Sequence, residues 1–121
     1  MNDHATPHAQ REDALRALVE LRVPVATATA ALASFDWDSD RELVNVTCAD
    51  AVRVLQQYLA GKLTAEDCQQ WADALEVRDD VGREPGFEDE LTEFLFEIAT
   101  PEVAGTLTPE RAQHWVQALQ P

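Results

Sequence analysis

Two consecutive amphipathic segments between residues 64 and 99 constrain the fold of this chain more than any other feature. The apolar residues of the first segment recur at helical spacing: Cys68, Trp71, Ala72 and Leu75. Those of the second repeat this spacing before Pro101 ends the pattern: Phe87, Leu91, Phe94, Leu95 and Ile98. Each pattern predicts a helix with one apolar face. We expect the two faces to cover each other, because exposed apolar surface is unfavourable.

Two helices are predicted at the start of the chain. Thr6 and Pro7 are typical of a helix start, and the helix should reach about Arg22 before Pro24 interrupts it. An Ala- and Thr-rich second helix is expected over Val25–Ser34, and its small side chains should allow close packing against a neighbour.

The segment after residue 34 combines a loop with an apolar piece. We expect Phe35–Asp40 to form a loop that ends in a capping box made by Ser39 and Glu42. The apolar piece Leu43–Val46 fits either a short strand or a helix. We favour the helix, because no other segment offers a strand partner and a lone strand leaves its backbone unpaired.

Three threonines occupy helix N-cap positions: Thr47, Thr64 and Thr108. Asp50 and Asp67 follow the first two at the spacing of a capping box. Helices joined by short turns predict an all-α fold, a compact bundle of about five to six amphipathic helices. A chain of 121 residues with 45% apolar residues predicts one helical domain over residues 6–121, after a flexible N-terminal tail over residues 1–5.

The composition also restricts location and chemistry. The chain has no run of about 18 apolar residues and no secretory-signal pattern, so we expect a cytoplasmic protein without a membrane span. Cys48 and Cys68 lie beside apolar neighbours, which favours buried free thiols over a zinc site or a disulfide. A net charge of −14 disfavours direct nucleic-acid binding, because phosphate binding needs a basic face.

Most of the negative charge lies in the two central segments. Residues 66–97 contain twelve carboxylates and two arginines, a net charge of −10. These acids lie opposite the apolar stripes, so their side chains should face solvent. An acidic patch on the surface suits a basic protein partner. Arg78 and Arg83 are expected to pair with neighbouring acids.

Carboxylates at helical spacing could instead hold a metal ion. Glu76 and Asp79, with Glu90 and Glu93 on the next helix, could bind Mg²⁺ or Mn²⁺ if the two faces converged. The spacing is similar to the ExxE and ExxD sets of MazG-type helical nucleotide pyrophosphatases. The order of the two sets is reversed here, however, and no Lys or Arg set follows them. We keep such an enzyme as an alternative and assign no metal ligand, cofactor or catalytic residue.

The tryptophans and His114 are expected in different environments. Trp37 lies between two aspartates in the predicted loop, which is typical of a binding hot spot for a basic partner; packing back onto the bundle is the equal alternative. Trp71 and Trp115 fall on apolar stripes and are expected in the core. His114 has no Ser, Cys or carboxylate beside it to suggest a catalytic triad, and the chain has no Gly-rich phosphate loop.

Two long pieces of the chain carry a family resemblance: VLQQYLAGKLTAEDCQQWADALEVRDDVG and LTEFLFEIATPEVAGTLTPERAQHWVQAL, with WDSDRELV as a weaker match upstream. Over Leu55–Leu119 the sequence resembles small bacterial immunity proteins of toxin–immunity systems, including those of contact-dependent growth inhibition. The resemblance implies an intracellular helical protein that binds and blocks the catalytic domain of a toxin. Many such toxins are nucleases, whose active sites are basic because their substrate is polyanionic.

The sequence therefore predicts a non-enzymatic immunity or inhibitor protein that binds a cognate basic toxin domain through an acidic surface. The candidate contacts are Trp37, Asp73, Glu76, Asp79, Asp80, Glu84, Glu88, Asp89, Glu90 and Glu93. A regulatory or scaffold module is a further alternative, including a homodimer formed through an uncovered apolar stripe. Acidity that only keeps a small protein soluble is the simplest alternative.

Overall fold

The computed structural model of the protein describes residues 7–35 and 41–120. These residues form seven helices and one two-stranded parallel sheet. The predicted compact helical fold is therefore confirmed, with a small sheet that the sequence analysis did not expect. The predicted tail and the predicted caps Thr6 and Ser39 lie outside the described residues.

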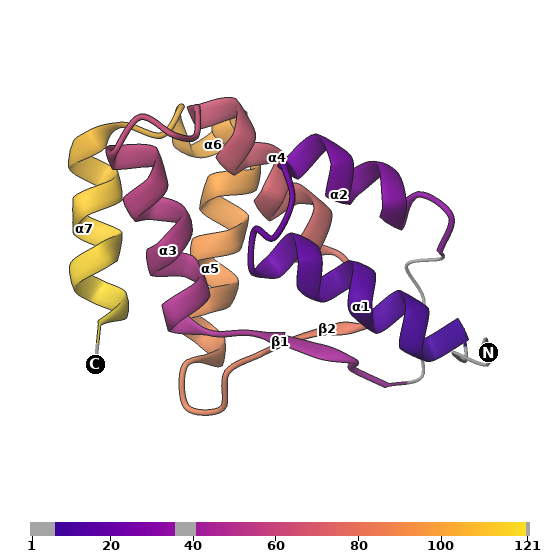
Figure 1. The fold of residues 1–121 in the computed structure, drawn as a ribbon. Coiled ribbons are helices and arrows are strands. Elements are labelled where there is room, and N and C mark those ends of the chain that lie inside the picture. Colours follow the sequence, from indigo (N-terminus) through magenta and orange to yellow (C-terminus); the bar gives the residue numbers. More distant parts are fainter. Residues whose placement is uncertain (1–6, 36–40, 121) are drawn as a thin grey trace.

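The first two helices, α1 (Pro7–Val19) and α2 (Val25–Leu32), pack against each other at one end of the molecule, as Figure 1 shows. Helix α1 ends before the predicted Arg22, because the chain turns at Leu21, whose φ is +57°. The Arg22 N–H donates to the Ala17 carbonyl at 2.9 Å, and the Leu21 N–H donates to the Leu18 carbonyl at 3.1 Å. This pair of bonds is a Schellman motif, which usually has glycine at its left-handed position.

Strand β1 (Val44–Val46) pairs in parallel with strand β2 (Val81–Arg83), and Asn45 lies opposite Gly82. The helix predicted over Leu43–Val46 is therefore wrong. Val44 and Val46 are buried and Asn45 is exposed, a period of two that suits a strand. The partner strand was missed because β2 lies in the charged, glycine-containing connection between the two central helices and has no apolar alternation of its own.

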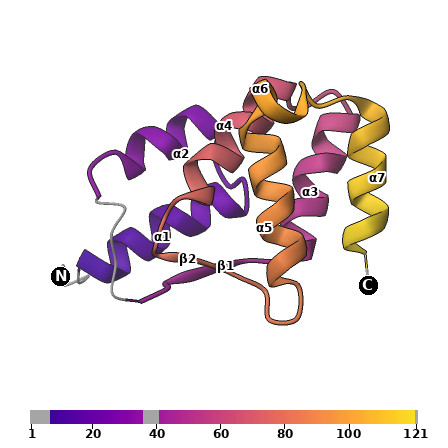
Figure 2. The same ribbon diagram turned by 180° about the vertical axis from the view of Figure 1, so that it is seen from behind.

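The remaining helices are α3 (Cys48–Leu59), α4 (Ala65–Glu76), α5 (Glu88–Ala99), the one-turn α6 (Pro101–Ala104) and α7 (Pro109–Leu119). The caps predicted at Thr47 and Thr64 are confirmed as reciprocal capping boxes with Asp50 and Asp67. Thr108 also accepts a bond from the Arg111 N–H, as predicted. Figures 1 and 2 show α3, α5 and α7 together at one end, α4 between them and α1–α2, and the β1–β2 ribbon along the base.

The apolar stripes of α4 and α5 cover each other, which confirms the central prediction. The ring of Trp71 packs edge to face against the ring of Phe94, with 6.3 Å between the ring centroids. Phe94 packs in the same way against Trp115, with 5.4 Å between the centroids. Trp71 is fully buried, and its indole N–H donates to the Leu18 carbonyl at 3.0 Å. One aromatic row therefore ties α1, α4, α5 and α7 into a single core.

None of the helices in the described part of the chain is long and apolar enough to cross a membrane. Both cysteines are free and buried, as predicted.

Candidate protein-binding surface

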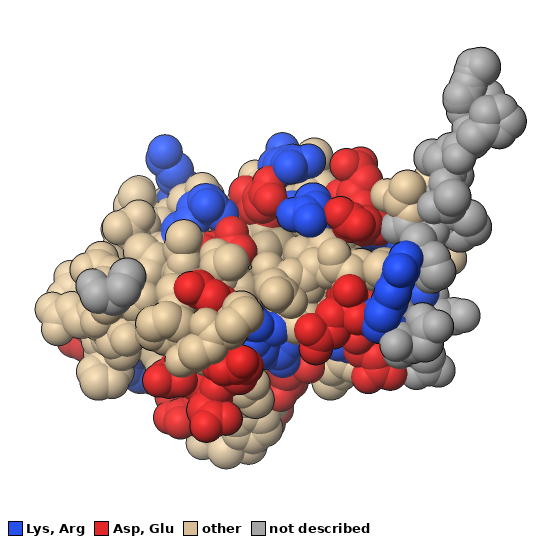
Figure 3. Space-filling view, turned by 90° about the horizontal axis from the view of Figure 1, so that it is seen from below, with Lys and Arg blue, Asp and Glu red and all other residues tan. Residues whose placement is uncertain are grey.

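The candidate acids do not share one environment. Six of them are exposed: Asp73, Asp79, Glu88, Asp89, Glu90 and Glu93. Glu76 and Glu84 are half-buried, and Asp80 is fully buried. Trp37, the tenth candidate contact, lies outside the described residues. Figure 3 shows acidic side chains on the underside in separate groups, with basic and uncharged side chains between them.

Asp80 belongs to the interior. Its carboxylate accepts bonds from Arg11 at 2.6 Å and from Arg78 at 2.9 and 3.2 Å. The Asp80 backbone carbonyl also accepts the Leu43 N–H at 2.8 Å, just before β1 begins. The prediction that Asp80 contacts a partner is therefore wrong, because the turn that leads into β2 points this carboxylate at two arginines. The predicted pairing of Arg78 with a neighbouring acid is confirmed.

Arg83 compensates part of the charge near the end of α4. Its guanidinium donates to the Glu76 carbonyl at 3.3 Å and to the Val81 carbonyl at 3.1 Å. Burial lowers the pKa of Arg83, although the carboxylates of Glu76 and Glu42 act in the opposite direction. Glu76 thus lies beside a cation of its own chain, and its charge is less available to a partner than that of a fully exposed acid.

Glu84 lies where α3 begins. Its carboxylate accepts the Cys48 N–H at 2.9 Å, which satisfies a backbone donor at the start of that helix. Burial raises the pKa of the Cys48 thiol, and the carboxylates of Glu84 and Glu90 raise it further. The start of α5 therefore lies close to the start of α3, and the charges of Glu84 and Glu90 both act on the same thiol.

The first turns of α5 carry the clearest acidic surface: Glu88, Asp89, Glu90 and Glu93. All four side chains are exposed, and no ion pair within residues 7–35 and 41–120 involves them. The three acids of the first turn also stabilise α5, because negative charge is favourable at a helix N-terminus. We call these four residues the α5 acidic group.

No match was found. Neither family models, nor characterised proteins, nor solved structures gave a similarity to this chain. The function must therefore be argued from the geometry and from the sequence pattern.

The structure also bears on the metal alternative, which required the carboxylates of α4 and α5 to converge. Within the described ranges, no group of three or more His, Cys, Asp or Glu side chains is placed to hold a metal ion. Glu76 lies beside Arg83, whereas Glu90 lies near Cys48 at the start of α3. His114 is exposed next to Trp115 on α7.

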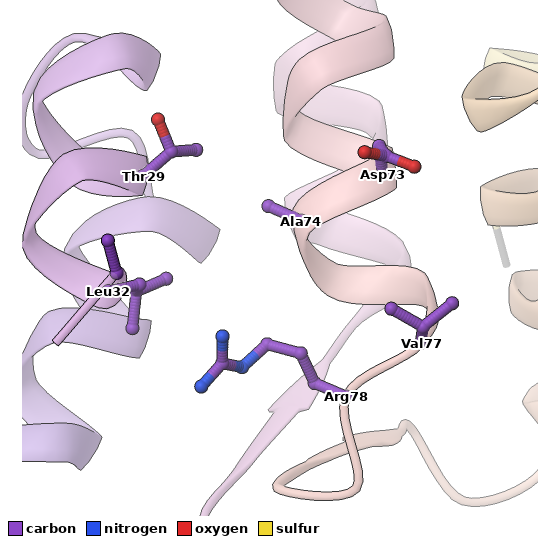
Figure 4. Close-up of a pocket in the computed structure, with 7 residues that line it drawn as sticks. Thr29, Leu32, Asp73, Ala74, Val77 and Arg78 are labelled. Atoms are coloured by element: carbon purple, nitrogen blue, oxygen red, sulfur yellow. The ribbon is translucent and has the colours of Figure 1, made fainter. Parts of the chain in front are cut away.

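A hollow of about 350 Å³ lies between α2 and α4. Figure 4 shows Thr29 and Leu32 on one side, Ala74 and Val77 on the other, and the Arg78 guanidinium reaching from the end of α4 toward α2. Asp73 also lines it. No sequence motif indicates this hollow, because its shape depends on how the two helices approach each other.

Two exposed apolar residues were also missed by sequence reasoning. Phe96 is 46% exposed on α5, and Val103 is 71% exposed on α6. For Phe96 a signal existed, because it lies on the opposite side of the helix from the buried positions Leu91 and Ile98.

Proposed function

We propose that this protein is a non-enzymatic immunity or inhibitor protein that binds the basic catalytic domain of a toxin in the cytoplasm and blocks it. The observation that carries the proposal is the α5 acidic group, four exposed carboxylates that pair with no cation among the described residues. The kind of partner comes from the expected resemblance of Leu55–Leu119 to immunity proteins, for which the comparisons with known proteins found no match.

The distribution of the arginines supports this reading. Arg11 and Arg78 pair with the buried Asp80, and Arg111 pairs with Glu97 at 2.5 Å. Arg53 pairs with Asp50 at the start of α3. The chain thus uses these cations to secure its fold and leaves the first turns of α5 strongly negative.

A negative surface of this kind suits an enzyme that acts on nucleic acid. The active site of a nuclease must attract phosphate, so carboxylates can occupy the same cleft and exclude the substrate. The net charge of −14 would also steer a basic domain toward this protein and increase the association rate. Both effects weaken as salt screens the charges.

The test uses the purified product of the adjacent gene as the candidate toxin domain, with binding followed by stopped-flow or surface plasmon resonance at low and high salt. Asp89→Lys should slow association roughly tenfold at low salt, because mutations at a steered interface change the association rate over about one to three decades. Glu110→Lys is the matched control: Glu110 is also the second residue of its helix and also exposed, but it lies on α7.

Salt-dependent binding that is weakened by Asp89→Lys and not by Glu110→Lys would support the proposal. Binding that does not respond to salt, or equal effects of the two variants, would refute the role of the α5 acidic group. Failure of the toxin domain to bind at all would refute the immunity function.

A further inference from the structure

One face of α5 is left open by the fold. The exposed residues Asp89, Thr92, Glu93 and Phe96 lie on one side of the helix, because each is three or four positions from another member of the set. They lie opposite the buried face formed by Leu91, Phe94, Leu95 and Ile98. In Figure 2, α5 stands in front of the other elements, and the exposure of these four residues shows that no helix or strand among the described residues covers them. We call these four residues together with Val103 the α5 outer stripe.

The stripe changes in character along its length. Its first half carries the carboxylates of Asp89 and Glu93, and its second half carries the exposed ring of Phe96. Val103 follows at the C-terminal end of α5, where two backbone hydrogen bonds hold the chain. The Thr100 N–H donates to the Phe96 carbonyl at 3.1 Å, and the Val103 N–H donates to the Thr100 carbonyl at 3.0 Å. On α5 itself, the carboxylate of Glu93 and the ring of Phe96 are three residues apart, so an acidic and an apolar group are neighbours on one exposed face.

We propose that the α5 outer stripe is the docking site for a basic segment of a protein partner that carries an aromatic or long aliphatic anchor. The inference rests on the proposed function, since it assigns a place within the acidic surface where the partner packs. Asp89 and Glu93 attract and orient the basic side chains. Phe96 and Val103 receive the anchor, and an arginine of the partner can also stack on the Phe96 ring.

Charge complementarity selects this occupant over a second copy of the chain. A symmetric dimer through the stripe would place the same patch of each copy against the other. The carboxylates of Asp89 and Glu93 would then meet either their own equivalents or the apolar half of the other copy, and in neither arrangement does this face of α5 supply a cation. A basic partner brings the opposite charge to the same carboxylates, so both halves of the stripe contribute to its binding.

The two halves should act on different kinetic steps. The carboxylates act at long range, so they mainly set the association rate. The apolar contacts form only after docking, so they mainly set the dissociation rate. A segment with positive charge alone would therefore bind more weakly than the same segment with an anchor.

The test uses two fluorescein-labelled synthetic peptides, both rich in arginine. One has a tryptophan at its centre, and the other has serine in its place. Binding is measured by fluorescence anisotropy. The tryptophan peptide should bind about tenfold more tightly to the wild-type protein, and Phe96→Ser should abolish the difference. Val77→Ser is the matched control, because Val77 is 55% exposed but lies at the end of α4 beside the hollow.

Equal affinity of the two peptides would overturn the inference, and so would a difference that persists in Phe96→Ser. If only Val77→Ser abolished the difference in affinity between the two peptides, the anchor would bind in the hollow between α2 and α4, and the inference would be overturned. A wild-type dimer in analytical ultracentrifugation that Phe96→Ser converts to a monomer would assign the stripe to a second copy. The peptide result does not depend on the toxin domain, so failure of the proposed function and failure of this inference can be told apart.

Discussion

Arg78 donates two hydrogen bonds to the carboxylate of Asp80, at 2.9 and 3.2 Å, and the Asp80 side chain is completely buried. Arg11 of α1 donates to the same carboxylate at 2.6 Å. Asp80 therefore joins the first helix to the turn between α4 and β2. Because its backbone carbonyl also bonds the residues that lead into β1, one residue positions both strands of the sheet.

Removal of the Asp80 charge should destabilise the fold strongly. Asp80→Asn leaves two guanidinium groups in the interior without their shared carboxylate, and breaking a buried ion pair in this way costs about 3–5 kcal/mol. The urea concentration at the midpoint of unfolding should be clearly lower for this variant than for the wild-type protein. Asp79→Asn is the matched control, because Asp79 is the exposed neighbour with the same charge. Equal midpoints for the two variants would contradict the structural role of Asp80.

The stability of the protein should decrease in acid partly through Glu97. Burial raises the pKa of Glu97, but hydrogen bonds from Trp115 at 2.8 Å and from Arg111 lower it more, so that the pKa lies below its ordinary value of 4.5. A carboxyl group with a lowered folded-state pKa contributes stability that is present above pH 4.5 and is lost as the pH falls through the folded-state pKa.

Glu97→Gln should therefore lower the Tm more at pH 7 than at the acid end of a series that runs down from pH 7, because the wild-type carboxylate loses its contribution as the pH falls through its lowered folded-state pKa. Thermal unfolding followed by circular dichroism over this pH range measures the effect. Glu93→Gln, one turn earlier on the exposed face, should lack this difference. If both variants lose stability equally at every pH, the bonds from α7 do not account for the lowered pKa.

Both cysteines should be unreactive in the native protein. Burial raises the pKa of Cys68 to about 12, and it also raises the pKa of Cys48. The thiolate is the reactive form, so a thiol reagent at pH 8 should modify neither residue until the protein unfolds. Ellman's reagent with the Cys48→Ser variant isolates Cys68. Rapid modification of this variant without denaturant would show that Cys68 is accessible.

The N-caps of the helices should each contribute measurable stability. Thr64→Ala and Thr47→Ala each remove a side-chain acceptor that bonds a backbone N–H, at 3.0 and 3.1 Å, and each should cost about 1 kcal/mol. Thr92→Ala is the control, because Thr92 lies exposed within α5 and caps nothing. Denaturant unfolding distinguishes the three variants, and a loss in Thr92→Ala as large as in Thr64→Ala would contradict the assignment.

The sequence by itself determined the helices and their inward faces. The stripes of α4 and α5 were predictable because the helical period places residues three and four apart on one side of the helix. The capping boxes at Thr47 and Thr64 were predictable because capping depends on residues only three apart. The end of α1 was not predictable, because Leu21 occupies the left-handed position at which glycine usually marks the end of a helix.

Only the tertiary structure decided which charges are internal and which segments pair. Asp79 and Asp80 are the same residue type, yet one is exposed and the other is buried against Arg11, a partner 69 positions away. Strand β1 likewise forms because Val81–Arg83 lies beside it, and the alternation within Val44–Val46 does not identify that distant partner. The exposed ring of Phe96 beside Glu93 also depends on which face of α5 the other helices leave uncovered, because local spacing defines a face but long-range packing decides whether it is buried.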